Sequence, residues 1–331
     1  MKLQRKIPMD NTRTVVFGDV QDAAQRIASH AHRTPVVTCR TIDDLVGACV
    51  FFKCENFQKS GAFKFRGAVN AISNLSAEEL SRGVVTHSSG NHAGALALAA
   101  KVFGTRAYIV MPSNSSAVKQ AAVRTYGGLI TECEPTLESR LNVAERLQEE
   151  TGAVMIPPFN HPHVIAGQAT AALELLDQVN DLEMIVAPVG GGGLMSGTCV
   201  AVRSLQPEVT VWGAEPTGAD DAFASKQAGQ LIPQLSPDTV ADGLRTSLGD
   251  LTWPYIRDEV DEIVTVTDQE TITAMKMFWE RTKMIIEPSS AVPLAALIKR
   301  FGESVSDSIR RPSKIGIILS GGNVDLANLP W

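Results

Sequence analysis

Short runs of apolar and β-branched residues alternate with longer helical segments along most of the chain. The short runs predict strands at 83–87, 106–112, 129–133, 184–189, 210–214, 263–267 and 315–319. The longer segments predict helices at 91–103, 116–126, 137–150, 164–179 and 268–282. Strands that are apolar on both faces and separated by helices are typical of parallel sheets covered on both sides. We therefore expect an α/β fold.

Three turns rich in glycine or serine fall where predicted strands end. They are Ser88–His92, Gly190–Gly193 and Ser320–Asn323. Ligands of open α/β sheets bind beyond the carboxyl ends of the strands. The shared placement of the turns predicts one site assembled from distant parts of the sequence.

Composition narrows the class of protein. Of the 331 residues, 44% are hydrophobic and 20% charged, which is typical of a soluble globular protein with one large or two medium domains. The net charge of −6, without a basic block, argues against nucleic-acid binding. The basic segment Met1–Pro8 is not followed by an apolar run, and no run approaches the ~20 apolar residues of a membrane span. We expect a cytoplasmic protein without a signal peptide or membrane partner.

The cysteines and paired histidines give no sign of a metal site or a disulfide framework. An odd number of cysteines at wide spacing predicts buried free thiols in a reducing compartment. These are Cys39, Cys49, Cys54, Cys133 and Cys199. The pairs His30/His32 and His161/His163 have no cysteine or carboxylate at ligand spacing, so we expect loop or helix residues there.

Lys64 stands between two phenylalanines in the small and apolar segment Ser60–Ala68. No acidic residue lies three or four positions away, so no helical ion pair accounts for its charge. Apolar surroundings lower the pKa of a lysine, and the neighbouring Arg66 is expected to lower it further. The neutral amine could then form a Schiff base with an aldehyde cofactor. A surface lysine whose stem packs on the aromatic rings is the alternative.

The other two turns indicate sites for anions. Gly190–Gly193 follows a strand and opens a helix, so its N–H groups could hold a phosphate; the alternative is a flexible tight turn. The pattern is neither G-x-G-x-x-G nor a P-loop. Ser88–His92 could hold a carboxylate at a helix N-terminus, with a plain N-cap as the alternative.

Together these motifs resemble those of the pyridoxal-phosphate enzymes of the tryptophan-synthase-β fold, known as fold type II. Ser60–Ala68 resembles the family's Schiff-base lysine motif, Ser88–His92 its substrate-carboxylate loop, and Gly190–Gly193 its phosphate cup. Their order and spacing match over nearly the whole chain. Further segments resemble serine racemases and 3-hydroxyaspartate dehydratases within the family, and include Glu132–Arg140, Ile165–Gln168, Glu215–Asp221 and Asn323–Trp331.

The resemblance implies a cofactor site between two doubly wound α/β domains with parallel sheets. The large domain would comprise residues 1–81 and 159–331, and a small mobile domain residues 82–158. Lys64 would carry pyridoxal phosphate and act as a base on one face of the substrate. The other residues implied in cofactor binding are Phe63, Asn91, Gly190, Gly191, Gly192, Gly193, Glu287 and Ser320. A serine facing the pyridine nitrogen would favour loss of a β-substituent over long-lived carbanion storage.

The resemblance also implies residues that contact the substrate and a cation. Ser89 would be the acid/base on the opposite face, which racemisation requires. Arg140 would receive a second substrate carboxylate; an exposed helix arginine is the alternative. The substrate loop would comprise Ser88, Ser89, Gly90, Asn91 and His92. Glu215, the Ala219 carbonyl and Asp221 would bind Mg²⁺ or Ca²⁺, with a solvated acidic turn as the alternative.

We expect dehydration and deamination of a β-hydroxy amino acid (3-hydroxyaspartate, serine or threonine) to a keto acid and ammonia. Serine racemase activity is expected beside it, in a homodimer. Two alternatives have the same fold. One is an enzyme that is primarily a serine or amino-acid racemase, and the other is a β-replacement enzyme such as a cysteine synthase. A nucleotide-binding regulator, in which Lys64 would be structural, is the alternative without catalysis.

Overall fold

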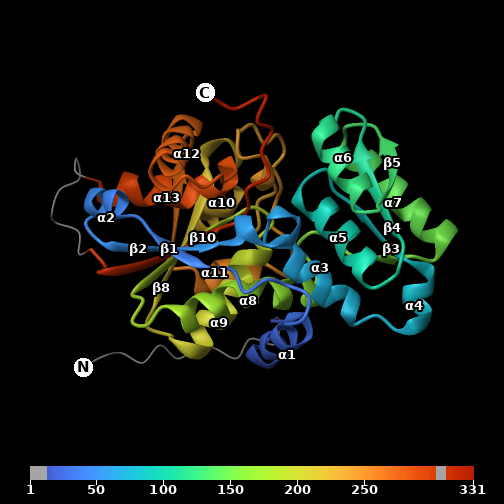
Figure 1. The fold of residues 1–331 in the computed structure, drawn as a ribbon, viewed down its shortest axis with the longest axis horizontal. Helices are drawn as coiled ribbons and strands as arrows, with labels where there is room; N and C mark the ends of the chain where they lie inside the picture. The colour runs from blue at the N-terminus through green and yellow to red at the C-terminus, as the bar shows by residue number, and fades with distance from the viewer. Residues whose placement is uncertain (1–12, 303–310) are drawn as a thin grey trace.

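The computed structural model describes residues 13–302 and 311–331 and contains two sheets, one in each half of the molecule (Figure 1). The larger sheet has the strand order β1-β2-β10-β7-β8-β9, and the smaller has the order β5-β4-β3-β6. The strands are β1 (Val36–Thr38), β2 (Cys49–Cys54), β3 (Val84–His87), β4 (Ala107–Pro112), β5 (Leu129–Cys133), β6 (Val154–Met155), β7 (Met184–Pro188), β8 (Thr210–Pro216), β9 (Glu262–Val266) and β10 (Lys314–Leu319).

Helices cover both sheets. The α-helices are α1 (Phe17–Ile27), α2 (Arg40–Val46), α3 (Lys64–Ser73), α4 (Ala77–Arg82), α5 (Asn91–Val102), α6 (Ala117–Thr125), α7 (Leu137–Thr151), α8 (Pro162–Gln178), α9 (Gly193–Leu205), α10 (Asp221–Ala228), α11 (Trp253–Glu259), α12 (Asp268–Thr282) and α13 (Pro288–Phe301). Short 3₁₀ turns are η1 (Glu55–Phe57), η2 (Lys59–Gly61), η3 (Thr217–Ala219) and η4 (Asp242–Leu244). None of the helices in the described ranges has the length and apolar character to cross a membrane.

The predicted α/β class is confirmed, and each predicted element lies within two residues of its observed bounds. Neighbouring strands run parallel in both sheets except β1, which pairs antiparallel with β2 at the sheet edge. The sequence did not indicate β1 or β2. β1 has three residues, and the buried β2 carries the charged Lys53, which hides its apolar pattern.

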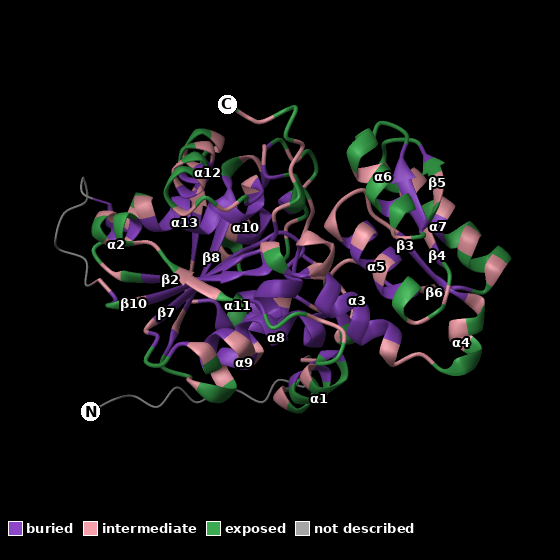
Figure 2. Ribbon diagram, in the orientation of Figure 1, coloured by how far each residue is buried: buried purple, intermediate pink, exposed green. Residues whose placement is uncertain are grey.

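The smaller sheet comes from one continuous stretch of chain, which begins with β3 and ends with β6. We call residues 84–155 the four-stranded unit. Strands from both sides of this stretch build the larger sheet, whose faces are covered by apolar side chains from α9 on one side and α13 on the other (Figure 2). The residues between the two sheets are therefore supplied by segments far apart in sequence.

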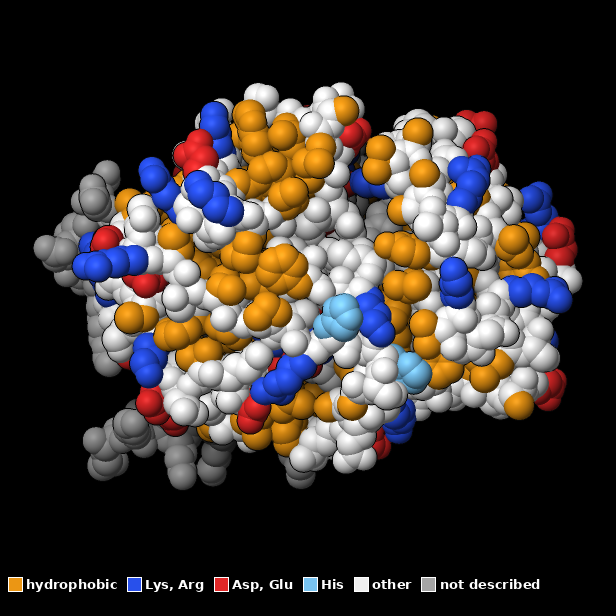
Figure 3. Space-filling model, viewed as in Figure 1, with side chains coloured by type: hydrophobic (Ala, Val, Ile, Leu, Met, Phe, Trp, Pro, Cys, Tyr) orange, Lys and Arg blue, Asp and Glu red, His pale blue; other side chains and the backbone are white. Residues whose placement is uncertain are grey.

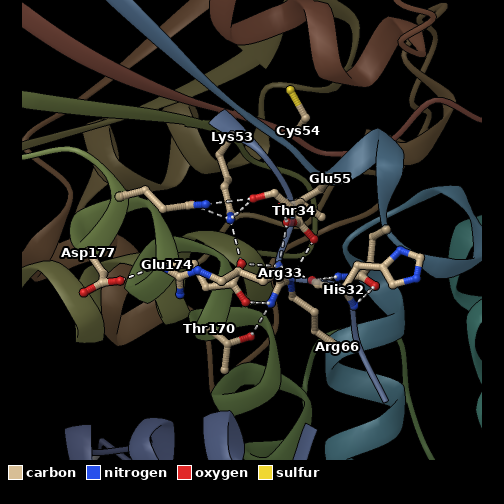
Figure 4. A network of polar contacts seen from close by, with 12 residues as sticks. His32, Arg33, Thr34, Lys53, Cys54, Glu55, Arg66, Thr170, Glu174 and Asp177 are labelled. Atoms are coloured by element: carbon tan, nitrogen blue, oxygen red, sulfur yellow. Dashed lines mark hydrogen bonds and ion pairs between the residues drawn. The ribbon is translucent and has the colours of Figure 1, made fainter. Parts of the chain in front are cut away.

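A buried network of charges fixes the start of α3 to β2 and α8 (Figure 4). The Arg66 guanidinium donates to Glu55 at 2.7 and 2.8 Å, and to Glu174 at 2.7 and 2.8 Å. The Lys53 ammonium donates to Glu174 at 2.6 Å and to the Thr34 carbonyl at 2.8 Å. Two cations and two carboxylates thus neutralise each other with most hydrogen-bonding positions filled, which a buried ionic group requires.

We predict that Arg66→Met destabilises the fold strongly, because it leaves Glu55 and Glu174 as buried charges with one partner fewer. Loss of one partner from a buried pair costs about 3–5 kcal/mol. Arg33→Met is the control, since the Arg33–Asp177 pair in the same region is exposed and is worth less than about 1 kcal/mol. Urea unfolding of the purified protein measures both. Equal midpoints for the two variants would contradict this account of the network.

Candidate active site

Lys64 begins α3 and is partly exposed, with its Nζ atom held by the protein. Nζ donates to the Pro158 carbonyl at 2.6 Å and lies 5.0 Å from the centre of the Phe63 ring. Crowding by protein atoms lowers the pKa of Lys64 to about 8, although the Glu287 carboxylate acts in the opposite direction. A sizeable fraction of a lysine with this pKa is neutral near physiological pH, as a nucleophilic amine must be.

Arg66 does not perturb Lys64 in the way the sequence led us to expect. Its guanidinium turns into the buried network and is neutralised by Glu55 and Glu174. The pKa of Lys64 falls because of burial, and Arg66 is not among the groups that shift it. The sequence could not reveal this difference, because both carboxylates come from other elements.

The glycine turn is a cup of unused hydrogen-bond donors. All four glycines are buried, and α9 begins at Gly193. In the part of the chain that the structure describes, no backbone N–H from Gly190 to Met195 has an acceptor. A Cβ on Gly191 would lie 2.3 Å from the Phe159 ring, so only glycine fits there. Buried donors without acceptors at a helix N-terminus are suited to a phosphate group.

The segment Pro158–Phe159 joins this cup to the amine. The Pro158 carbonyl accepts from Lys64, while the next side chain, Phe159, lies against Gly191 and Gly193. Neighbouring residues of this segment thus contact an amine that can condense with an aldehyde and a cup that can hold a phosphate. These residues fit pyridoxal phosphate, which has both groups.

The Ser320–Asn323 turn lies against the two residues that precede Lys64. The Phe63 N–H donates to the Ser320 carbonyl at 3.0 Å, and Ala62 forms a bridge with Gly321. The Ser320 hydroxyl is buried and lies 3.0 Å from the Ser290 hydroxyl. Ser290, which contacts Ser320 from α13, was not singled out by the sequence.

Asn91 and Glu287 connect the four-stranded unit to this turn. The Asn91 amide donates to the Glu287 carboxylate at 2.8 and 3.0 Å and accepts from the Asn323 amide at 2.9 Å. Burial raises the pKa of Glu287 to about 7. Lys64 and Glu287 therefore have pKa values shifted towards neutrality from opposite sides, as is common in active sites.

The Ser88–His92 loop lies between β3 and α5, as predicted. The Ser88 and Ser89 side chains are partly exposed, and the N–H groups of Ser89, Asn91 and His92 have no acceptor among the described residues. Gly90 precedes the helix and its N–H donates to the Ser88 hydroxyl at 3.3 Å. Free N–H groups at the start of a twelve-residue helix suit a carboxylate.

The ring of His92 is buried away from this loop surface. One ring nitrogen, Nε2, lies 2.9 Å from the Ile156 carbonyl, and Nδ1 is buried without a partner. Burial, with a smaller contribution from the charge of Lys64, lowers the pKa of His92 to about 3, so the ring is neutral. His92 can therefore contribute its backbone N–H to a carboxylate, but no positive charge.

Arg140 lies on α7 beside the end of β3. Its Nε donates only to the Thr136 carbonyl of its own helix, at 3.3 Å, and no described carboxylate pairs with it. Its positive charge adds to the effect of burial in lowering the pKa of His87, the residue before the serine loop. An unpaired guanidinium near this loop is available to a ligand.

Glu215 near the end of β8, Ala219 in η3 and Asp221 at the start of α10 are all buried. Glu215 accepts from the N–H groups of Ala222 and Phe223 at 3.1 and 2.7 Å, and Asp221 accepts from Leu248 at 2.9 Å. Burial raises the pKa of Glu215 well above its usual range and that of Asp221 to about 6. No cluster of three or more His, Cys, Asp or Glu side chains suited to a metal occurs in the described ranges. The ligand set that the resemblance implies has only two such side chains, because its third oxygen is the Ala219 carbonyl.

The five cysteines are free thiols, in agreement with the sequence, although Cys49 is exposed. Sequence reasoning gave no role to Pro158, Phe159 and Asn323. Asn323 stands in a turn that the sequence did mark, whereas no local pattern distinguishes Pro158 and Phe159.

Comparisons with known proteins show which family the chain belongs to. A family model described as pyridoxal-phosphate dependent enzyme matches residues 27–321. The chain is 51% identical to a serine racemase of Oryza sativa subsp. indica over 311 residues, covering 94% of this chain and 91% of that protein. It is 47% identical to a beta-hydroxyaspartate dehydratase of Paracoccus denitrificans (strain Pd 1222) over 315 residues, covering 95% and 98%.

A solved structure of maize serine racemase has a TM-score of 0.91 and 50% identity, with 95% of each chain covered. The family match spans both sheets, the first two strand-end turns and the start of the third. The chain therefore belongs to the pyridoxal-phosphate dependent enzymes and has their fold type II architecture.

Proposed function

We propose that this protein is a pyridoxal-phosphate dependent lyase and racemase of β-hydroxy amino acids. It would convert 3-hydroxyaspartate, serine or threonine to a keto acid and ammonia, with the water lost in the elimination regained when the nitrogen is released by hydrolysis, and it would racemise serine beside this reaction. The observation that carries the proposal is the link from the Lys64 amine through Pro158–Phe159 to the glycine cup. The named activities of the serine racemase and hydroxyaspartate dehydratase relatives support the choice of substrates.

The cofactor would be held by residues from both sheets. The N–H groups of Gly190–Gly193 would receive the phosphate, and Lys64 would bond to the aldehyde carbon. Asn91 and Glu287 would lie along one edge of the ring, with Phe63 beside it and the Ser320 hydroxyl towards the ring nitrogen. A hydroxyl is a weaker partner for that nitrogen than a carboxylate, so it does not favour a protonated ring.

When bound, pyridoxal phosphate withdraws electrons from the substrate α-carbon and makes its proton acidic. Nζ of Lys64 would remove that proton, which its lowered pKa permits at neutral pH. Return of a proton from the Ser89 hydroxyl on the opposite face would give the other enantiomer. Departure of a β-hydroxyl before that return would give the dehydration product. Competition between these two outcomes sets the balance of the two activities.

The substrate carboxylate would bind the free N–H groups of Ser89, Asn91 and His92 at the start of α5. Arg140 would pair with the second carboxylate of 3-hydroxyaspartate. Its guanidinium has no acidic partner among the described residues and acts electrostatically on His87, directly before the loop. A planar fork of donors is well matched to a carboxylate.

We further propose a divalent cation between Glu215, the Ala219 carbonyl and Asp221. Two buried carboxylates with no basic side chain within ion-pair distance, in the described part of the chain, are costly unless a proton or cation compensates them. The Asp221 Oδ1 atom is buried without a hydrogen-bond partner. Hard oxygen ligands suit Mg²⁺ or Ca²⁺.

The remaining proposals concern assembly and movement. Phe57, Ile285 and Leu326 are exposed apolar residues of the segments around the larger sheet. Hydrophobic side chains gather on that half of the molecule (Figure 3), and a homodimer would cover such a surface. Sedimentation at the mass of one chain would contradict the dimer.

Residues 82–158 would move as a small domain relative to residues 1–81 and 159–331. The protein would act in the cytoplasm.

The first prediction concerns Lys64. Borohydride reduction of the wild-type protein should fix the cofactor to Lys64, as measured by peptide mass spectrometry. Wild type should release keto acid from at least one of L-serine, L-threonine and the 3-hydroxyaspartates. Lys64→Arg keeps the charge but should lack both properties, because a guanidinium forms no such bond.

Absence of keto acid and of the opposite enantiomer with every substrate would contradict the proposed function. Sulfide-dependent formation of cysteine from an activated serine would instead favour a β-replacement enzyme. A colourless wild-type protein that does not react with borohydride would favour a regulator without catalysis.

A second prediction assigns Arg140. Arg140→Ala should lower kcat/KM for 3-hydroxyaspartate by about 10- to 1,000-fold, because a charge-assisted hydrogen bond is worth roughly 1.5–3 kcal/mol and often comes in pairs. Activity on serine should change far less. Arg146→Ala is the control on the same helix, since Arg146 pairs with Glu150 at an exposed position. An equal loss on both substrates would remove the proposed role in specificity.

A third prediction tests the cation. Chelation should lower the melting temperature, and Mg²⁺ or Ca²⁺ should restore it. At a hundredfold excess over Kd, the cation should raise the free energy of unfolding by about 2.7 kcal/mol. Because the folded pKa of Asp221 is about 6 and its usual value is 3.8, the metal-free protein should lose stability as the pH rises through that window.

Asp221→Asn should abolish the response to added cation and remove the part of this dependence on pH that Asp221 contributes, while Glu215, whose pKa is also raised, keeps its own. Asp181→Asn, at an exposed position, is the control. A wild-type melting temperature that is indifferent to chelator would argue against the site.

A further inference from the structure

An ion pair joins the four-stranded unit to the wall of the active site. The Lys119 ammonium on α6 contacts the Asp242 carboxylate at the start of η4, 123 residues away in sequence. Among the ion pairs formed by the described residues, this one alone connects residues 84–155 with the rest of the chain. The catalytic roles proposed above do not use it.

Asp242 stands on a turn that is fixed behind the glycine cup. The Gly243 N–H donates to the Ser289 hydroxyl of α13 at 3.1 Å, and Leu244 is buried in the core of the larger sheet. A Cβ on Gly190 would lie 3.1 Å from the Leu244 Cα, so η4 packs directly on the cup. The carboxylate therefore belongs to the rigid half of the site.

Lys119 stands on a helix with few ties to that half. It lies in the first turn of α6, where its N–H donates to the Ser116 hydroxyl at 3.4 Å. α6 packs on β5 and α5 of the four-stranded unit, and Val123 is its one fully buried side chain. The lysine must therefore follow any movement of that unit.

Both charges also act on Glu287. Burial gives the largest rise in the pKa of Glu287, Asp242 adds to the rise, and Lys119 opposes it. The pair thus lies close to the carboxylate that binds Asn91. Separation of the two charges would change both the closure of the site and the charge within it.

We propose that the Lys119–Asp242 pair is a latch that holds the four-stranded unit closed over bound substrate, which makes both side chains positioning residues for the reaction. The inference rests on the proposed function, because it assigns the pair a role in that site. Both side chains are about one-third exposed, at 36% and 37%. A pair exposed to this degree contributes modestly and is weakened by salt, so it can adjust the closed population without locking it.

The test is a double-mutant cycle in the holoenzyme with the substrate that wild type turns over. Lys119→Met and Asp242→Asn should each raise KM about two- to fivefold, with a smaller change in kcat, because each breaks the same half-exposed pair. The double variant should be no worse than either single variant. Added salt should raise the wild-type KM towards that of the variants and leave theirs nearly unchanged.

The direction of the two single effects separates a latch from an effect on Glu287 alone. Loss of Lys119 would raise the pKa of Glu287 and loss of Asp242 would lower it, so a pure charge effect moves the two variants in opposite directions. A latch moves both in the same direction. Hydrogen exchange supplies a readout besides activity: substrate should protect the amides of 117–125 in wild type, and less in either variant.

Arg146→Met and Glu150→Gln are the matched controls, since that exposed pair lies within α7 and crosses no boundary. Additive effects, opposite effects, or unchanged exchange in α6 would each overturn the latch. A wild-type enzyme that turns over substrate while both variants match it would refute the latch and leave the proposed function standing. Failure of wild type to bind the cofactor at Lys64 would refute the function itself.

Discussion

The active site depends on holding one lysine amine in crowded surroundings at a fixed position. Lys64 starts a helix, and its ammonium contacts a backbone carbonyl instead of a carboxylate. A carboxylate partner would stabilise the charged form and raise the pKa of the amine. A neutral carbonyl orients the amine with a smaller rise in its pKa. The same segment that orients the amine lies against the glycine cup, so the spacing of the two groups is set by packing.

The protein treats its buried charges in three different ways. The network around Arg66 balances cations and carboxylates and fixes α3 in place. In the candidate active site, burial lowers the pKa of Lys64 to about 8 and raises that of Glu287 to about 7. Glu215 and Asp221 are buried carboxylates without a basic partner among the described residues, and burial raises the pKa of both. Buried charge is thus compensated by ion pairs in the first place and by shifts in proton affinity in the other two.

The candidate site is built from residues around both sheets. The cup, Lys64 and Glu287 belong to segments around the larger sheet, whereas the serine loop, Asn91 and Arg140 belong to the four-stranded unit. In the proposed function, the groups that would hold the cofactor and those that would hold the substrate therefore come mainly from different sheets. Relatives named for different reactions, racemisation of serine and dehydration of hydroxyaspartate, are nearly equally similar to this chain. The chemistry shared by the fold is accordingly separate from the few side chains that select the β-substituent.

The sequence alone predicted the alternation of strands and helices and the three strand-end turns, and it singled out Lys64 as the candidate lysine. Each is a local property, because periodicity, glycine content and apolar neighbours act within a few residues. It failed where partners come from afar: Arg66 looked like an influence on Lys64, yet Glu55 and Glu174 neutralise it. Pro158, Phe159, Lys119 and Asp242 carry no local pattern at all. Only the tertiary structure could bring them to the site, since burial and Coulomb energies depend on distances in space that the order of residues does not specify.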